Sequence, residues 1–406
     1  MDRMIYFDNA ATTFPKAECV YEKMDEANRN YAVNAGRGSY ALAEKAANMI
    51  RDVRKQILKL ADASQVAEVV LTASATLACN QIFGGINWDN IKTVYVSAFE
   101  HNAVMRTIHS FQQKFGFEVE ELAIDSKIME LDIDKIGFQF VRKKPDMVIM
   151  THVSNVTGYI LPIQEVAKLA KEYHAITVVD GAQALGLVPV SLKRTPVDFY
   201  IFAGHKTLYG PFGVGGFIQS CNLKLNPFLK GGTGSASLQL EMPGSDSLLT
   251  KQENLMFDAG GYEPGSPNIV ALAGLHASLE EILALQEKEG NPAYLLEKEQ
   301  ELSKYLICNL EAISGVSIYV PQNYENGSHV GIVSFNVDGY QAADIGMILD
   351  EDYHIAVRTG YQCAPLIHKH LEVFDFAGVV RASLGRYTTK EEIDSLVAAV
   401  REIVEG

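Results

Sequence analysis

Short apolar runs that alternate with amphipathic helical patterns constrain the fold of this 406-residue chain most strongly. The runs are rich in β-branched and aromatic residues, which is typical of strands. They are VVLT (69–72), TVYV (93–96), MVIMT (147–151), ITVVD (176–180) and DFYIF (198–202). Helical patterns between them include residues 39–60, a stretch from about Ala75 and a stretch that Pro162 opens. Because continuously apolar strands belong in a sheet covered on both faces, we predict an α/β fold with a mostly parallel sheet.

A different pattern begins at about residue 267. Two long helical patterns are followed by an apolar strand, a further helix, two short strands and a capping box before a last helix. They lie at 267–287, 292–313, 331–335, 340–350, 355–358, 378–383 and Thr389-Lys390-Glu391-Glu392. We therefore predict a large domain over residues 16–265. A smaller α+β domain would comprise residues 266–406 together with an N-terminal arm, residues 1–15. The Gly-, Ser- and Pro-rich segments 231–248 and 260–267 are predicted loops.

Charge and hydropathy exclude several classes of protein. The 35 Lys+Arg and 50 Asp+Glu residues give a formal net charge of −15, and no Lys/Arg-rich run offers a basic patch for nucleic acid. The N-terminus lacks the apolar stretch of a secretory signal. No uninterrupted apolar segment approaches the roughly 18 residues that a membrane helix needs. We expect a cytoplasmic protein that binds neither nucleic acid nor membranes.

The five cysteines are odd in number and scattered, without a CxxC pair or the spacing of zinc ligands. We therefore expect free thiols and no metal site. A free cysteine is usually a small buried apolar residue. We interpret four in this way: Cys19, Cys79, Cys221 and Cys308. Cys363 differs because it lies in a loop flanked by Gly and Pro with Arg358 and His368 nearby in sequence, a setting that favours the thiolate.

Polar side chains follow each strand of the predicted sheet, where ligands of α/β proteins bind. They are Thr72-Ala73-Ser74-Ala75-Thr76, Glu100-His101-Asn102, His152-Val153-Ser154-Asn155, Asp180-Gly181-Ala182-Gln183 and Ala203-Gly204-His205-Lys206. Taken singly, a lysine in such a position is usually solvated, and an aspartate usually caps a helix. Taken alone, His101 is best interpreted as a core histidine whose ring nitrogens are hydrogen-bonded. His152 is best interpreted as a structural residue. Arg381, between apolar residues, also fits a buried ion pair. The glycine-rich segment 210–216 lacks the strand–turn–helix setting of a dinucleotide loop.

Together these residues suggest one chemistry. A carbonyl cofactor held as a Schiff base needs a lysine, and Lys206 would supply it. A pyridine ring needs a carboxylate to keep its nitrogen protonated, as Asp180 would. A phosphate needs N–H groups and hydroxyls at a helix start, as in the Ser74–Thr76 turn. A flat ring such as His101 can lie against the cofactor. The set predicts a pyridoxal 5'-phosphate (PLP) site.

The sequence also resembles the class V, fold-type I PLP enzymes, specifically the cysteine desulfurase and selenocysteine lyase group. The matching stretches occur in family order over nearly the whole chain, and the lysine and cysteine motifs are specific. They are YFDNAATT (6–13), EHN (100–102), HVSNVTG (152–158), VVDGAQALG (178–186), AGHKTLYGPFGVGG (203–216), YEPGSPN (262–268), RTGYQCAP (358–365) and RASLG (381–385).

The resemblance implies a role for each matching position. Lys206 would carry the cofactor, Asp180 would pair with its ring nitrogen and His101 would stack on its ring. Gln183 would bond its phenolic oxygen, with Asn155 nearby. The phosphate would be held by Thr76, the backbone of Ala75, His205 and, from the other subunit of a homodimer, Ser266. Arg381 would clamp the substrate carboxylate, with Arg358 as a second substrate-binding residue.

Cys363 is the decisive residue in this resemblance. In the family this cysteine attacks the sulfur of the cofactor-bound substrate, which yields alanine and an enzyme persulfide that passes sulfur to an acceptor. The short spacing from Cys363 to Arg381 resembles that of type II desulfurases. It implies a tightly held cysteine loop and an external acceptor protein.

Three departures from the family pattern stand out. The turn after VVLT has Ala73-Ser74-Ala75-Thr76-Leu77 and so lacks one phosphate-side hydroxyl and a glutamate. Ala203 replaces a phosphate-binding serine of many type II members, and Thr233 is a candidate to compensate. We expect looser phosphate retention, at about 1 kcal/mol per lost hydrogen bond. Tyr361-Gln362 replaces the common histidine pair before Cys363, which affects the proton shuttle at the persulfide step.

We expect a homodimeric, PLP-dependent cysteine desulfurase with L-cysteine as substrate. Two kinds of alternative stay open. Within PLP chemistry the alternatives are a selenocysteine lyase acting on L-selenocysteine, an aminotransferase or another lyase. The presence of both Cys363 and Arg381 favours desulfuration over transamination. Outside it, the altered phosphate turn is compatible with a weakly catalytic scaffold or sulfur-carrier docking partner.

Overall fold

A seven-stranded sheet forms the centre of the larger part of the molecule. The computed structural model describes residues 4–35, 40–220, 223–233, 240, 242 and 259–406. The strand order is β2 (Glu68–Thr72), β10 (Gly215–Gln219), β9 (Phe199–Ala203), β8 (Ile176–Asp180), β7 (Met147–Thr151), β3 (Thr93–Val96) and β4 (Glu118–Glu121). From β9 to β4 all neighbours are parallel, whereas β10 runs antiparallel to both β2 and β9. This mostly parallel sheet confirms the predicted fold class.

Helices cover both faces of this sheet, because alternate residues of its strands point to opposite sides. In β7, Met147 and Ile149 pack toward α3 (Ala75–Gly85) and α4 (Asn102–Phe115), while Val148 and Met150 pack into the opposite core. That second core is completed by α2 (Ala41–Leu60), α5 (Ile133–Arg142), α6 (Ile163–Glu172) and α7 (Ile269–Glu289). A hairpin of β5 (Ile124–Asp125) and β6 (Glu130–Leu131) directly precedes α5 in the chain.

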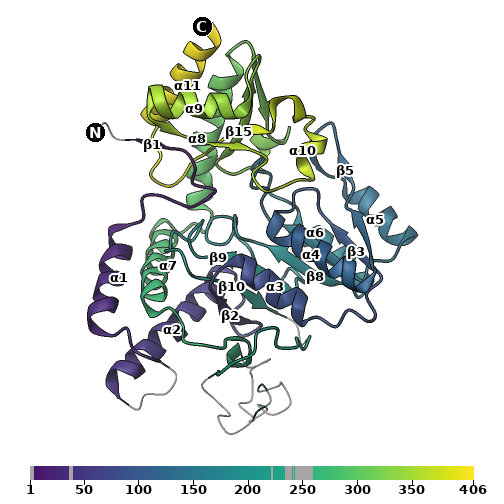
Figure 1. Ribbon diagram of the computed structural model, residues 1–406, viewed down its shortest axis with the longest axis vertical. Coiled ribbons are helices and arrows are strands. Elements are labelled where there is room, and N and C mark those ends of the chain that lie inside the picture. Colours follow the sequence, from purple (N-terminus) through teal and green to yellow (C-terminus); the bar gives the residue numbers. More distant parts are fainter. Residues whose placement is uncertain (1–3, 36–39, 221–222, 234–239, 241, 243–258) are drawn as a thin grey trace.

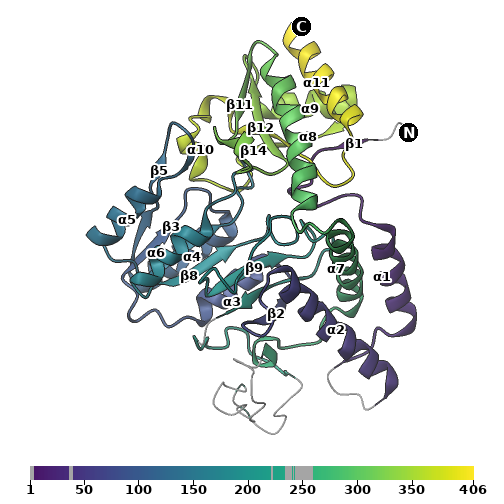
Figure 2. The same ribbon diagram turned by 180° about the vertical axis from the view of Figure 1, so that it is seen from behind.

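A smaller antiparallel sheet lies above the large one in Figures 1 and 2. Its order is β11 (Val316–Tyr319), β12 (Ile332–Val337), β15 (Val379–Ser383) and β14 (Arg358–Gly360). The helices packed with it are α8 (Tyr294–Glu311), α9 (Ala342–Tyr353) and α11 (Lys390–Glu405). The predicted capping box is present at the start of α11, where Thr389 and Glu392 bond each other's backbone N–H groups.

The N-terminal segment joins the two sheets. Its strand β1 (Ile5–Tyr6) pairs in parallel with β13 (Ile355–Ala356), and Phe7 is fully buried in the core of the smaller sheet. The chain then runs down to α1 (Glu18–Asn30), which packs against α7 (Figure 1). The long helix α7 thus packs with elements of the larger part, since it contacts α1 and α2. The predicted domain boundary at residue 265 stays a prediction.

Helix α7 bears on the expectation about hydropathy. By length and composition alone it is apolar enough to cross a membrane, although Glu280 and Glu281 interrupt its apolar run. More than half of its apolar window is buried inside the molecule, with residues such as Leu275, Leu279 and Ile282 fully covered. A buried core helix passes the same test of composition, and the packing of α7 against α1 and α2 fits that description.

The expectation that four cysteines are buried is only partly correct. Cys79 is buried on α3, whereas Cys19 is half-buried and Cys308 is exposed. Cys308 was misjudged because α8 buries Leu306, Ile307 and Leu310, so helical spacing turns the residue between them to the outside. Cys221 and most of the predicted loop 231–248 lie outside the described residues.

Candidate active site

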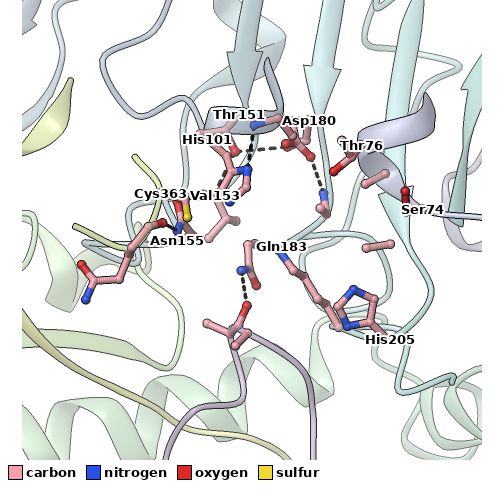
Figure 3. A pocket seen from close by; sticks show the side chains of 18 of the residues that line it. Ser74, Thr76, His101, Thr151, Val153, Asn155, Asp180, Gln183, His205 and Cys363 are labelled. Carbon is pink, nitrogen blue, oxygen red and sulfur yellow. Dashed lines mark hydrogen bonds between the residues drawn. The ribbon is translucent and has the colours of Figure 1, made fainter. Parts of the chain in front are cut away.

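A cavity of about 250 Å³ lies at the carboxyl ends of the parallel strands. All the site residues predicted from sequence line it except Ser266. They are Lys206, Cys363, His101, Asp180, Ala75, Thr76, Asn155, Gln183, His205, Arg358 and Arg381. Figure 3 shows Cys363 and Asn155 on one side of the cavity, Ser74, Thr76 and His205 on the opposite side, and His101 and Asp180 between them. Parallel strands bring these sites together because their carboxyl ends share one edge.

Lys206 follows β9 in a turn that many hydrogen bonds fix. Its carbonyl oxygen accepts from the N–H of Tyr209 at 2.7 Å, and the carbonyl oxygen of the preceding residue accepts from Thr12, Thr13 and Lys16. Burial lowers the pKa of Lys206, which Asp180 partly offsets. The net lowering favours a reactive amine, because only the neutral amine is a nucleophile.

Asp180 is the last residue of β8 and is buried. Its Oδ1 accepts from the N–H of Ala182 at 3.0 Å, which directs the carboxylate to the edge of the cavity. The neighbouring Gln183 donates from Nε2 to the carbonyl oxygen of Ala10 at 2.7 Å. The N-terminal segment therefore forms part of the cavity wall, and Ala10 and Ala11 line it.

His101 caps the start of α4, where its Nδ1 accepts from the N–H of Ala103 at 3.0 Å. Burial, reinforced by the nearby charge of Lys206, lowers the pKa of His101 and favours a neutral, flat ring. The preceding Glu100 is fully buried, and its Oε1 accepts from both Ser97 Oγ and the N–H of Thr151 at 2.5 Å. These bonds fix the loop that presents His101, and burial raises the pKa of Glu100 to about 8.

The opposite end of the cavity offers donors to an anion. Ser74 caps α3 by accepting from the N–H of Leu77, and it leaves the N–H groups of Ala75 and Thr76 without an intrahelical partner. The ring atom Nδ1 of His205 is buried and has no partner among the described residues. Burial lowers the pKa of His205 to about 4. A Cβ on Gly215 would lie 2.8–2.9 Å from the backbone of this turn, so β10 needs glycine there.

Arg381 reaches the cavity from β15 and is almost completely buried. Its Nη1 donates to the carbonyl oxygen of Asn155 at 2.9 Å, and its Nη2 donates to Asp8 Oδ1 at 2.7 Å. Its Nε has no partner among the described residues. Arg358 stands opposite Arg381 in the register of β14 and β15, so two guanidinium groups serve one cavity.

The loop that carries Cys363 is tied to both sides of the cavity. The carbonyl oxygen of Cys363 accepts from the N–H of Asn102 at 2.6 Å, and Asn155 Nδ2 donates to the carbonyl oxygen of Gln362 at 2.8 Å. Gln362 and Cys363 both have left-handed backbones, with φ of 39° and 56°. Such a conformation is costly for side chains other than glycine and persists where surrounding bonds hold it. The loop holds Cys363 exposed at the cavity.

Two predicted residues lie elsewhere. Ser266 lines a separate cavity with Thr72, Gly265 and Asn268. Thr233 does not line the cavity that contains Lys206 and Cys363. His152 bonds Tyr200 Oη through Nδ1 at 2.7 Å and is buried, which fits its structural interpretation.

Sequence patterns do not assign Asp8 and Gln362 to the site. Both lie in motifs shared with the resembling family, but nothing in the sequence connects Asp8 with Arg381. Among the described residues, no group of three or more His, Cys, Asp or Glu side chains is arranged to hold a metal ion.

The residues present fit a pyridoxal phosphate. A lysine, a carboxylate and a flat ring surround the cavity, and unpaired N–H groups of α3 and the unpaired Nδ1 of His205 lie at one end. Ala203 lines the same cavity in place of a hydroxyl side chain. The anion site therefore depends on backbone donors, on Thr76 and on His205.

Comparison with known proteins agrees with this geometry. The family model Aminotransferase class-V matches residues 5–396. A cysteine desulfurase of Shigella sonnei and one of Escherichia coli are each 30% identical to this chain, covering 98% of it and 93% of their own length. The apo structure of a cysteine desulfurase from Thermococcus onnurineus superposes with a TM-score of 0.87 at 30% identity and covers 99% of this chain and 95% of that one. The chain belongs to the class-V aminotransferase family.

Proposed function

We propose that this protein is a PLP-dependent cysteine desulfurase that converts L-cysteine to L-alanine and holds the sulfur as a persulfide on Cys363. The observation that carries the proposal is the exposed Cys363 in the same cavity as Lys206, Asp180 and Arg381. The 30% identical relatives named cysteine desulfurases support the same reading.

In this proposal each predicted residue that lines the cavity has a role. Lys206 would hold the cofactor covalently and move the α-proton of the substrate, since its lowered pKa favours the neutral amine. When bound, PLP supplies an electron sink that makes this proton removable. Asp180 would keep the ring nitrogen protonated, and His101 would lie on the ring. Ala75, Thr76 and His205 would hold the phosphate, with Gln183 and Asn155 near the phenolic oxygen.

Arg381 and Arg358 would bind the substrate carboxylate and so direct the substrate thiol toward Cys363. The Cys363 thiolate then attacks the substrate sulfur. A new S–S bond forms while the substrate Cβ–S bond breaks, and its electron pair goes to carbon, which takes a proton. The sulfur is oxidised as the carbon is reduced, so L-cysteine and the Cys363 thiol yield L-alanine and a Cys363 persulfide without an external oxidant. Sulfide then leaves with a reductant, or sulfur passes to an acceptor protein.

The test measures alanine and sulfide produced from L-cysteine in the presence of a thiol reductant. Cys363→Ser should retain the visible absorption of the bound cofactor but lose most sulfide production. Cys308→Ser is the matched control, because Cys308 is also exposed but lies on α8, away from the cavity. Full sulfide production by Cys363→Ser would contradict the persulfide mechanism. Turnover of L-selenocysteine without turnover of L-cysteine would identify a selenocysteine lyase, and a protein without the absorption band would be a scaffold.

We also propose a cytoplasmic homodimer that delivers sulfur to an acceptor protein. The position of Ser266 supports the dimer, because this residue lies outside its own chain's cavity, where its Oγ accepts from Asn34 Nδ2 at 3.5 Å. Sedimentation would test the dimer. Mixing Lys206→Ala chains with Ser266→Ala chains would test the shared residue. One cavity of the mixed dimer would then combine Lys206 of one chain with Ser266 of the other, so the phosphate site weakened in Ser266→Ala should be restored there.

A further inference from the structure

Asp8 makes a contact with the substrate side of the cavity that the proposed mechanism does not use. Its Oδ1 accepts from Arg381 Nη2 at 2.7 Å, although the two residues are separated by 373 positions. The Arg381 side chain is 4% exposed and that of Asp8 is 16% exposed, so water screens the pair little. Asp8 itself does not line the cavity.

The backbone around Asp8 is fixed against the strand that carries Arg381. Asp8 forms a parallel bridge with Ser383 on β15, and the N–H of Ser383 donates to the carbonyl oxygen of Phe7 at 2.6 Å. Tyr6 Oη donates to the carbonyl oxygen of Asp8 at 3.1 Å. The carboxylate is therefore held in place on a strand neighbour, so it can set the direction of the guanidinium.

The pair uses only part of the hydrogen-bonding capacity of Arg381, which also lines the cavity. A guanidinium has five N–H donors. One is used by Asp8 and one by the carbonyl oxygen of Asn155, so the other N–H bonds are available, including that of the unpaired Nε. Because Arg381 also lines the cavity, its ion pair with Asp8 acts at the binding site and not only in the fold.

We propose that Asp8 is a positioning residue that orients Arg381 for the carboxylate of an amino-acid substrate. This inference rests on the proposed function, because that function assigns the carboxylate to Arg381. Asn155 fixes one terminal nitrogen and Asp8 the other, so the plane of the guanidinium is set before substrate arrives. Preorganisation of this kind lowers the entropy lost on binding. The charge of Asp8 also balances part of the positive charge that Arg358 and Arg381 place at one cavity.

The test compares a ligand that has a carboxylate with one that lacks it. L-alanine and ethylamine differ by this group, and binding of each to the holoenzyme is followed through the visible absorption of the cofactor. Asp8→Ala should weaken L-alanine binding by about tenfold, the order of one charge-assisted hydrogen bond, and leave ethylamine binding unchanged. Asp8→Asn keeps an oxygen acceptor and should recover most of the affinity. Asp25→Ala is the control, because Asp25 forms an exposed ion pair with Arg29 on α1.

The outcomes separate the alternatives. An equal loss for L-alanine and ethylamine would overturn the inference, because it would indicate a general loss of the site. Unchanged L-alanine binding in Asp8→Ala would also overturn it. Should Asp8→Ala fold poorly, Asp8→Leu, which keeps most of the side-chain volume but has no oxygen acceptor, carries the same test, with KM for L-cysteine expected to change more than kcat. Neither ligand contains sulfur, so a wild-type protein that binds L-alanine but releases no sulfide would contradict the proposed function alone.

Discussion

The cofactor wall and the substrate wall of the cavity are built in different ways. We define the cofactor wall as Ala75, Thr76, His101, Asp180, His205 and Lys206, and the substrate wall as Arg358, Gln362, Cys363 and Arg381. The first belongs to strand ends and helix starts of one parallel sheet. The second comes from the smaller sheet and a loop with two left-handed residues. The first wall follows largely from local structure, and the second depends on contacts between distant segments throughout.

This difference has a consequence for function. The side chains of the cofactor wall at α3 and α4 are positioned by short-range caps, whereas the turn of Lys206 also receives bonds from the N-terminal segment. The substrate wall is held by long-range bonds from Asp8, Asn102 and Asn155. We therefore expect changes in the cofactor wall to affect cofactor retention, and changes in the substrate wall to affect substrate binding and sulfur transfer.

The largest effect is expected on the cofactor wall. Lys206→Ala removes the amine that would carry the cofactor and move the α-proton, so alanine formation should fall by at least about 1000-fold. The visible band of the lysine-bound cofactor should disappear as well. Lys16→Ala is not a suitable control, because Lys16 bonds the same turn. The exposed Lys55 on α2 is suitable. Full activity of Lys206→Ala would break the assignment of the cofactor wall.

A smaller effect is expected on the substrate wall. Arg358 is exposed and stands opposite Arg381, so Arg358→Ala should raise KM for L-cysteine by roughly three- to tenfold, as for one partly solvated charge contact. The visible band should not change, since Arg358 does not belong to the cofactor wall. Steady-state kinetics at low and high salt measure this, with the exposed Arg51→Ala as control. Loss of cofactor in Arg358→Ala would mean that the two walls are not independent.

The smallest effect on activity concerns Glu100, which fixes the loop of His101. Its pKa of about 8 in the folded state lies above the 4.5 of an exposed glutamate, so the folded protein holds one more proton. Its contribution to stability is therefore complete below about pH 4.5 and is lost as the pH rises to about 8, at about 1.4 kcal/mol per pH unit. Glu100→Gln stays neutral and should gain stability relative to the wild type as the pH rises.

Thermal unfolding of both proteins between pH 5.5 and 7.5 measures this difference, and Glu44→Gln, on an exposed position of α2, is the control. KM for L-cysteine should stay the same. A constant difference between Glu100→Gln and the wild type over this pH range would show that Glu100 is ionised in the folded protein.

The sequence predicted the strands of the large sheet well, and the structure confirms all five at nearly the same bounds. These strands can be identified from their composition because they are buried on both faces of the sheet and are therefore continuously apolar. The sequence patterns missed β10 and β4. In β10, Gly215 and Gly216 have low strand propensity but allow close approach to β2, β9 and α3, and the edge strand β4 (Glu118–Glu121) has three glutamates among its four residues. The patterns also placed Cys308 in the core, although the helical period of α8 turns this residue outward.

The sequence by itself determined the mostly parallel sheet and most residues of the cavity. These follow from local patterns, because parallel strands end at a common edge and polar residues after them must meet there. Tertiary structure alone decided how Arg381 is held and how Cys363 is presented. The contact of Asp8 with Arg381 spans 373 positions, and the bond from Asn102 to the Cys363 loop joins the two sheets. No local pattern encodes such contacts, because they depend on how the second sheet packs on the first.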